Sequence, residues 1–496
     1  MTIHKPSGGV EIPHKKWTSD NAIAVMDVPR RVVIPMRQHL GAPCEPVVKR
    51  GDAVKAGQVI GDSKGYVSAP IHSSVSGTVS NVVQALHPGG GRCAAVEIAA
   101  DGAQIAHESV SPKTYSNKAE FLALVRASGL VGLGGAGFPA HVKLNPPAGS
   151  EILDLIVNGA ECEPYITADY RLMVERADSI VGGLKMIIDA IGIPRALIAI
   201  EDNKPGAIAL MKKLTAGDPR IGVVSLRSYY PQGAEKTLIY ACLGHRVPPG
   251  KLPADVHALV MNVNSVSLIH QYITTGMPLV NKIVTVSGAA VANPGNVEAP
   301  IGTPLSGVFD FCGGFKAPPK KIIMGGPMMG VAQYTLDVPV IKNTNALLAF
   351  DEKEARHDAE TACIRCGKCA ESCPMRLLPL YINAAGVKKD VERLQKYHAI
   401  DCIECGACEY NCPAKRRIVQ SARLGKELLR AVAAAEKAAA AAAAEKAAAA
   451  AAADKAASAT AEKAAGKATA GKTAAAVPAE KAATATAADK AGKGAS

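Results

Sequence analysis

The sequence has few aromatic residues and no long apolar run. Only 4% of its 496 residues are Phe, Tyr or Trp, and Trp17 is the single tryptophan. The N-terminal segment lacks the apolar stretch of a cleaved secretory signal, so we predict no such signal. The best candidate for a membrane span, residues 184–200, carries Lys185, Asp189 and Arg195. We therefore predict no transmembrane helix.

The balance of apolar and charged residues is that of a folded protein. Apolar residues make up 48% and charged residues 20% of the chain, which is enough to build a core. The length predicts about three folded units at roughly 150 residues each. A net charge of +12 is compatible with nucleic acid or an anionic membrane surface as partner. Eleven basic and seven acidic residues from Lys426 onward supply +4 of it, so we predict no nucleic-acid partner.

Thirteen cysteines are the most informative feature of the composition. Without a secretory signal they indicate a reducing compartment, where clustered thiols bind metals rather than form disulfides. CIRCGKCAESCP and CIECGACEYNCP both have the spacing C-x2-C-x2-C-x3-C-P, whose first three cysteines bind one cluster and whose fourth completes the other. The spacing predicts two [4Fe–4S] clusters, one on Cys363, Cys366, Cys369 and Cys412, the other on Cys402, Cys405, Cys408 and Cys373.

The alternatives for these cysteines are zinc and disulfides. Structural zinc uses two well-separated pairs, so two copies of a four-cysteine run favour clusters. Helical patterns between the runs predict a helical ferredoxin-type domain over residues 350–430. The five isolated cysteines are predicted to be mostly buried small hydrophobic residues: Cys44, Cys93, Cys162, Cys242 and Cys312.

The remaining sequence predicts a multidomain chain of α/β and β modules. Residues 1–112 contain short β-rich runs between glycine turns, and they resemble the barrel-sandwich of biotinyl and lipoyl carrier domains. Lys64 lacks the flanking pattern of a modified lysine, so we predict no carrier role. Residues 113–275 alternate helix and strand patterns, which is typical of an α/β domain. Residues 276–345 form a small β domain.

The C-terminal residues 431–496 form an Ala/Lys-rich tail of low complexity. Acid–lysine pairs at steps of about nine residues fall on opposite helix faces, so no apolar stripe results. Alanine favours a solvated helix at first, whereas Gly466, Gly471, Pro478 and Gly492 indicate disorder later. A solubilising tail is favoured over a tether or a surface-binding arm.

The segment from Gly132 to Gly137 satisfies G-x-G-x-x-G. A Rossmann fingerprint needs a strand before it and a helix beginning within it, but here a helical pattern precedes and Phe138-Pro139 follows. We therefore reject that assignment. In its longer form, GLGGAGFPAHVKL followed by NGAECEPYITAD, the segment resembles the flavin-binding region of the NADH-oxidising subunit of respiratory complex I and its diaphorase relatives.

That resemblance implies an α/β domain that binds FMN non-covalently and uses NADH as substrate. Glycine N–H groups would approach the FMN phosphate and a lysine would add positive charge. The chain departs from the pattern at Leu133, Ala160 and Ala234, where an arginine, an aspartate and a glutamate are usual, and these positions bear more on NADH than on FMN. The implied cofactor-binding residues are Gly132, Gly134, Gly135, Phe138, Lys143, Asn158, Glu161, Glu163, Tyr230, Gly233, Glu235 and Asn264.

The order of the modules, with GGPMMG at residues 325–330 in the small β domain, resembles the C subunits of Rnf/Rsx electron transport complexes over residues 1 to about 430. The resemblance identifies the small domain as β-grasp, SLBB-like. It implies an NADH-linked oxidoreductase subunit, peripheral on the cytoplasmic side of the inner membrane and touching the membrane through its partners. Those partners would be the other Rnf/Rsx subunits, membrane-embedded and ferredoxin-like. Electrons would pass between NADH and ferredoxin-type carriers through FMN and two clusters.

Two other functions remain open from the sequence. One is a soluble relative with the same modules, such as the cobalamin reductase of bacterial microcompartments. The other is a non-catalytic electron-relay or docking subunit with an empty flavin site. No Ser-His-Asp constellation occurs and the twelve histidines are scattered, so we assign no catalytic side chain. The sequence determines neither the translocated ion nor the direction of electron flow.

Overall fold

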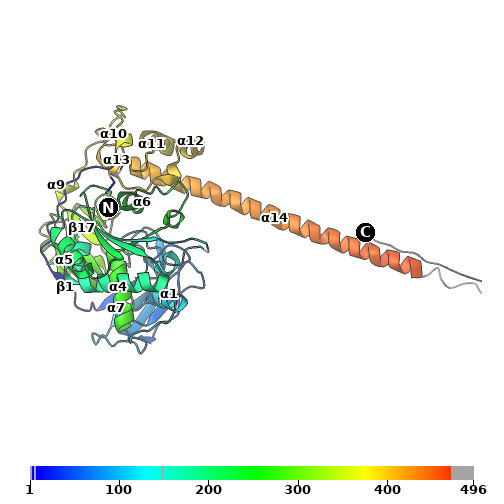
Figure 1. Cartoon of the computed structure of the whole chain (residues 1–496), viewed down its shortest axis with the longest axis horizontal. Helices are drawn as coiled ribbons and strands as arrows, with labels where there is room; N and C mark the ends of the chain where they lie inside the picture. Colours follow the sequence, from blue (N-terminus) through cyan, green and yellow to red (C-terminus); the bar gives the residue numbers. More distant parts are fainter. Residues whose placement is uncertain (1–2, 5–6, 148, 471–496) are drawn as a thin grey trace, which may run out of the picture. The chain divides into compact units, whose positions relative to one another are not determined.

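The structure is a computed structural model that describes residues 3–4, 7–147 and 149–470 (Figure 1). Contacts divide the chain into two units that meet between Glu427 and Leu428. All strands, from β1 to β17, and the helices up to α13 belong to the first unit. Helix α14 (Ile418–Ala470) begins in the first unit and continues into the second.

The first module is a sandwich of two antiparallel sheets, as predicted. One sheet has the order β2-β8-β7-β4 and the other β3-β5-β6. Apolar side chains from both sheets, among them Ile34, Ile60 and Ile98, are fully buried between them. The strands are β2 (Arg31–Pro35), β3 (Glu45–Pro46), β4 (Ala53–Val54), β5 (Val59–Asp62), β6 (Ile71–His72), β7 (Gly77–Leu86) and β8 (Arg92–Ala100).

The second module is a parallel four-stranded sheet with helices on both faces, which confirms the α/β prediction. Its strand order is β11-β10-β9-β12. Burial on both faces explains why β10 reads as an almost continuous apolar run. The strands are β9 (Asp154–Gly159), β10 (Arg195–Glu201), β11 (Ile221–Leu226) and β12 (Ala258–Asn262).

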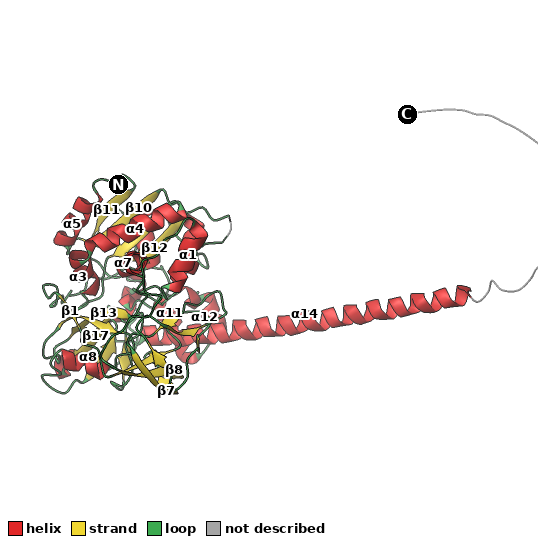
Figure 2. Cartoon of the chain, turned by 90° about the horizontal axis from the view of Figure 1, so that it is seen from below, coloured by secondary structure: helices red, strands yellow, loops and turns green. Residues whose placement is uncertain are grey.

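Alternate strand residues pack against different helices. Ile198 and Met261 face the core that contains α4 and α7, whereas Leu197 and Val260 face the core of α6. Helix α4 crosses the sheet (Figure 2), and a Cβ atom on its Gly183 would lie 2.1 Å from a carbonyl oxygen of α7. The helices are α1 (Lys118–Ala127), α2 (Ala140–Lys143), α3 (Ala168–Glu175), α4 (Ala177–Ile191), α5 (Pro205–Thr215), α6 (Glu235–Leu243) and α7 (Val263–Thr275).

The small β domain is a six-stranded mixed sheet in the order β1-β14-β13-β17-β15-β16. It includes two strands outside the predicted range 276–345, namely β1 (Ile23–Val25) and β17 (Ala346–Phe350). Strand β1 pairs in parallel with β14 and so brings the N-terminal segment to this sheet. The other elements are β13 (Asn281–Ser287), β14 (Gly295–Pro300), α8 (Leu305–Phe311), β15 (Lys321–Met324), β16 (Val331–Gln333) and α9 (Glu352–Ala355).

The cysteine-rich domain is helical, as predicted. Its helices are α10 (Lys368–Glu371), α11 (Pro379–Lys388), α12 (Val391–Lys396) and α13 (Ala407–Tyr410), followed by the first turns of α14. Helix α14 runs on through Gly466, where the sequence predicted loss of helix. The predicted disorder after Ala470 lies outside the described residues. None of the helices within the described ranges has both the length and the hydropathy of a membrane span.

Candidate functional site

The parallel sheet has a switch point between β9 and β12, because the chain leaves β9 towards β10 on one side and reaches β12 on the other. In sheets of this kind, ligands bind outside the carboxyl ends of the strands at the switch point. Asn158 is the next-to-last residue of β9 and Asn262 the last of β12, and the two residues are neighbours in register. The four segments singled out in the sequence meet at this edge.

The glycine-rich loop lies against the end of β12. It connects α1 to α2 and is closed at its base by a hydrogen bond from the Gly132 N–H to the Phe138 carbonyl oxygen at 2.9 Å. Gly134 and Gly135 are exposed at the tip. A Cβ atom on Gly134 would lie 2.6 Å from Asn262 Nδ2, so the loop backbone reaches the strand end only because this residue is glycine.

The segments after β9 and before α6 are joined by side-chain contacts. Asn158 Nδ2 donates to the Gly233 carbonyl oxygen at 2.8 Å, and Asn158 Oδ1 accepts from the Ala160 N–H at 3.1 Å. Lys143 Nζ lies 2.5 Å from Glu235 Oε1, which links α2 to the start of α6. The structure thus brings residues from three predicted segments together at one edge of the sheet.

The fourth segment begins α7. Asn262 accepts from the Asn264 N–H at 2.9 Å and donates to Asp169 at 2.6 Å, which caps the helix. Asn264 Nδ2, a buried donor, and Gln232 Oε1, a buried acceptor, have no hydrogen-bond partner among the described residues. Buried polar groups normally have partners, so these two atoms fit a site that a polar cofactor completes.

The two acidic residues that the resemblance assigns to the flavin site point into the protein. Glu161 accepts hydrogen bonds from the N–H groups of Asp169 and Tyr170 at the start of α3. Glu163 accepts from the N–H groups of Met328 at 3.0 Å and Met329 at 2.9 Å. Burial raises the pKa of each carboxyl group to about 7. Both residues are half-buried in this structure, and their carboxylates hold the loop through these hydrogen bonds.

The three departures from the family pattern lie at or beside this edge. Leu133 is 1% exposed and packs in the core beneath the glycine loop, and Ala160 is fully buried. Ala234 precedes α6 and is half-buried. Apolar contacts therefore replace the polar side chains usual at the first two positions.

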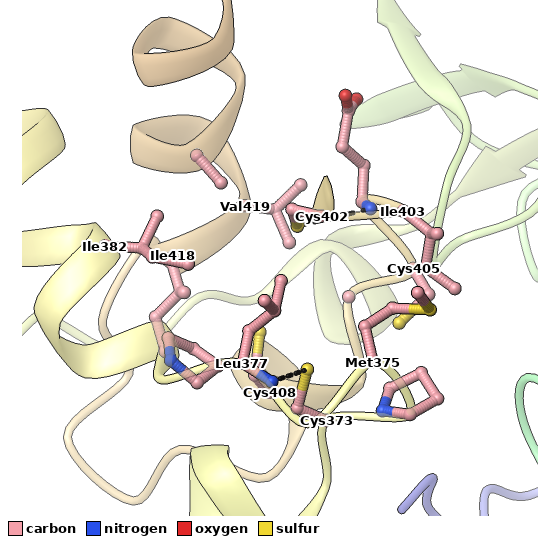
Figure 3. A pocket seen from close by; sticks show the side chains of 15 residues that line it. Cys373, Met375, Leu377, Ile382, Cys402, Ile403, Cys405, Cys408, Ile418 and Val419 are labelled. Atoms are coloured by element: carbon pink, nitrogen blue, oxygen red, sulfur yellow. Dashed lines mark hydrogen bonds between the residues drawn. The ribbon is translucent and has the colours of Figure 1, made fainter. Parts of the chain in front are cut away.

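The eight motif cysteines line two cavities of nearly equal size. The inner cavity, of about 430 Å³, contains Cys373, Cys402, Cys405 and Cys408 (Figure 3). The outer cavity, of about 450 Å³, contains Cys363, Cys366, Cys369 and Cys412. These are the two sets that the spacing predicts, each with its fourth cysteine from the other run. Ile418 lines both cavities.

The two cavities differ in exposure. Cys363 and Cys366 of the outer cavity are exposed, whereas Cys373 and Cys405 of the inner one are buried. Among the described residues no three His, Cys, Asp or Glu side chains converge on a single-ion site. The cysteines instead surround space with a largely apolar lining.

Backbone N–H groups point at two sulfur atoms of the inner cavity. The Leu377 N–H donates to Cys373 Sγ and the Glu404 N–H to Cys402 Sγ, both at 3.4 Å (Figure 3). Burial raises the pKa of the Cys405 thiol to about 11. Four thiolates therefore need the positive charge of a metal cluster, whose binding releases their protons. The cavity fits an iron–sulfur cluster in its donor set and hydrogen bonding.

Tyr230 is placed differently from the other predicted site residues. Its side chain is 1% exposed, and its hydroxyl group donates to the Cys405 carbonyl oxygen at 2.6 Å. It therefore joins the loop before α6 to the inner cavity.

Sequence reasoning missed several residues that support the two sites. Lys16 binds the segment after β9. The Met328 N–H donates to the Glu163 carboxylate, and the Met328 carbonyl oxygen lies against Gly406 beside Cys405. Lys426 donates to the Cys402 carbonyl oxygen at 2.9 Å. GGPMMG was a visible signal for Met328, but no local pattern marks either lysine.

Family models match four segments of the chain. They are the RnfC barrel sandwich hybrid domain over residues 4–103, the Nuo51 FMN-binding domain over 125–271, the SLBB domain over 283–332 and the 4Fe-4S dicluster domain over 362–415. The matches follow the order of the modules described above.

Three curated relatives, all of them C subunits of redox complexes, are similar over most of the chain. The one from the proton-translocating ferredoxin:NAD(+) oxidoreductase complex of Clostridium ljungdahlii is 47% identical, covering 86% of this chain and 93% of the relative. The one from the Na(+)-translocating ferredoxin:NAD(+) oxidoreductase complex of Acetobacterium woodii is 44% identical, covering 84% and 96%. The one from the ion-translocating oxidoreductase complex of Rhodobacter capsulatus is 39% identical, covering 77% and 75%.

Proposed function

The chain belongs to the RnfC family of C subunits of ion-translocating oxidoreductase complexes, and from this premise we propose that it passes electrons between NADH and ferredoxin-type carriers. The observation that supports this most directly is that the four flavin-type segments converge at one sheet edge in the same compact unit as two four-cysteine cavities. The chain is then the NADH-linked oxidoreductase subunit of the complex.

The crevice between β9 and β12 would hold FMN. The exposed backbone of Gly134 and Gly135 and the Lys143 side chain would bind its phosphate, and Asn264 would bind polar ring atoms, which agrees with the unpartnered Asn264 Nδ2. FMN, when bound, accepts a hydride from NADH and can release the two electrons singly. The chain's own residues bind and orient the cofactor.

The two cysteine sets would hold the clusters, with Cys373, Cys402, Cys405 and Cys408 around the inner one. Cys363, Cys366, Cys369 and Cys412 would hold the outer one. Such clusters carry one electron at a time and suit the traffic that a flavin releases. Ile418, which lines both cavities, keeps the two sets adjacent.

The partners would be the other subunits of an Rnf/Rsx complex. The relatives are named as ion-translocating, and ion translocation requires a membrane, so we place the chain as a peripheral subunit on the cytoplasmic side of the inner membrane. The exposed outer cysteines suit electron exchange with a protein partner.

Purified full-length chain tests the proposal. We expect bound FMN in the absorption spectrum, about eight iron atoms per chain and NADH-dependent bleaching of the flavin. Clusters without flavin or bleaching would instead support a non-catalytic relay subunit. Membranes washed with high salt should release the chain, whereas a microcompartment reductase would co-purify with shell proteins and not with membranes.

A further inference from the structure

An N-terminal arm, residues 7–25, contacts both the flavin-type site and the region of the inner cysteine cavity. It is matched as part of the barrel-sandwich module, yet it packs on other modules. The Gly9 N–H donates to the Ser372 carbonyl oxygen at 2.8 Å. Ser372 directly precedes Cys373, which lines the inner cavity. Val10 and Tyr230 exchange two backbone hydrogen bonds, and β1 joins the small β domain.

In the middle of the arm, Lys16 binds the segment that follows β9. Its ammonium group donates three hydrogen bonds, to the carbonyl oxygens of Glu161, Glu163 and Ile166 at 2.7, 2.9 and 2.6 Å. These are all the donors that a lysine ammonium has. One side chain therefore closes the loop between Gly159 and α3.

The segment needs such a partner because its backbone is irregular. No helix or strand runs from Ala160 to Thr167, and Glu161 and Tyr165 have φ angles of 51° and 69°, in the left-handed region. Carbonyl groups in such a loop have no ladder or helix partner, and leaving them buried without one is costly. Lys16 supplies three of the missing bonds.

The charge of Lys16 also acts on its surroundings. Burial lowers the pKa of Lys16, and the carboxylate of Glu161 partly opposes this change. In return, Lys16 lowers the pKa of Glu161, which burial raises. The titratable groups that share this environment are Lys16 of the arm, Cys162 and Glu163 of the loop, Asp169 of α3, Lys204 before α5, Glu201 of β10 and Lys282 of β13.

We propose that the arm is part of the flavin site and that Lys16 is the positioning residue through which it acts. By fixing the carbonyl groups of Glu161, Glu163 and Ile166, Lys16 holds the loop that follows Gly159 in the shape that completes the flavin site. The inference rests on the proposed function, because it concerns the same FMN site. Lys16 itself does not need to touch the cofactor.

The test compares Lys16→Met with Lys15→Met in the full chain. Lys15 is an adjacent cation, but it binds Glu354 and the Tyr165 hydroxyl group rather than the loop carbonyls. FMN is titrated into flavin-free protein and followed by fluorescence quenching. Loss of three charge-assisted bonds should weaken FMN binding by about tenfold or more in Lys16→Met, and hydrogen exchange in residues 160–167 should become faster. Lys15→Met should match wild type in FMN binding, because Lys15 contacts only the side chain of Tyr165 in the loop and none of the loop carbonyl groups.

The pH profile of FMN binding distinguishes positioning from a general loss of stability. Without the Lys16 cation the pKa of Glu161 rises further, so the midpoint of the profile should move to higher pH. Lys16→Gln keeps donors but not the charge and should show this shift with smaller changes in hydrogen exchange. If Lys16→Met does not fold, Lys16→Gln alone is compared with wild type.

Two outcomes separate this inference from the function beneath it. A wild-type chain that binds no FMN would contradict the proposed function. Wild-type FMN binding that both Lys16 variants reproduce, with the same pH profile and exchange rates, would overturn the role of Lys16 and leave the function standing.

Discussion

The hydroxyl group of Tyr230 donates a hydrogen bond of 2.6 Å to the backbone carbonyl of Cys405. Tyr230 belongs to the loop that precedes α6 at the flavin-type crevice, whereas Cys405 lines the inner cysteine cavity. Both pack with Val10 and Ile12 of the N-terminal arm in one small core. The inner cavity is therefore the one that lies against the flavin-side loops.

Tyr230→Phe should alter the inner cluster selectively. The change removes the hydroxyl group of Tyr230. The buried carbonyl group of Cys405 then loses its hydrogen bond from this side chain, at a cost of about 1–3 kcal/mol. In a redox titration followed by electron paramagnetic resonance, we expect the potential of one cluster to shift and the other to stay. Tyr229→Phe is the matched control, because no hydrogen bond of the Tyr229 hydroxyl group is found in the described part of the chain. Equal potentials in all three proteins would contradict the prediction.

Serine substitutions should remove the clusters one at a time. Cys363→Ser affects the outer set and Cys405→Ser the inner set, because the two residues line different cavities. Iron content should fall from about eight to about four atoms per chain in each variant. Cys242→Ser, at an isolated buried cysteine, serves as the control and should keep the full iron content. Loss of all iron from Cys363→Ser would show that the two sets are not independent.

The stability of Glu163→Gln relative to wild type should depend on pH. The folded-state pKa of Glu163 is about 7 against an ordinary value of 4.5, so its contribution to stability is present below pH 4.5 and is lost as pH rises to about 7. The free energy of unfolding of the variant minus that of wild type should therefore increase between pH 5 and 8, by at most about 3 kcal/mol. Urea unfolding at both pH values measures it.

The control for this experiment is Glu392→Gln, at an exposed position of α12. Its difference from wild type should be the same at both pH values. If the stability difference of Glu163→Gln is also the same at both pH values, burial does not raise the pKa of the Glu163 carboxyl group, and the prediction is wrong.

The neighbours Gly134 and Gly135 should respond differently to alanine. At Gly134 the new Cβ atom would displace Asn262, whereas at Gly135 no heavy atom lies within 4 Å. Gly134→Ala should therefore lower both the thermal stability of the flavin-free chain and its FMN affinity. Gly135→Ala should leave that stability unchanged and weaken FMN binding only, because the added methyl group meets the cofactor. A Gly135→Ala chain that binds FMN as wild type does would place the phosphate elsewhere.

The cysteine sets and the modules were predictable because their signals are local. A C-x2-C-x2-C-x3-C-P run carries its own geometry, and the glycine loop and its three companion segments each bear a recognisable pattern. The direction of the Glu161 and Glu163 side chains was not predictable, since it depends on the N-termini that their neighbours present. Lys16 was invisible for the same reason, because its partners lie about 145 residues away.

Strand β1 has a consequence for how the chain is made. Residues 23–25 leave the ribosome before their partner strand β14, which ends at Pro300. At about 5–20 residues per second, the arm waits on the order of tens of seconds for its place in the sheet. Its contacts at Ser372 become possible later still. The arm is thus synthesised well before the segments that it binds, and it can dock fully only after the cysteine-rich domain that contains Ser372 has been made.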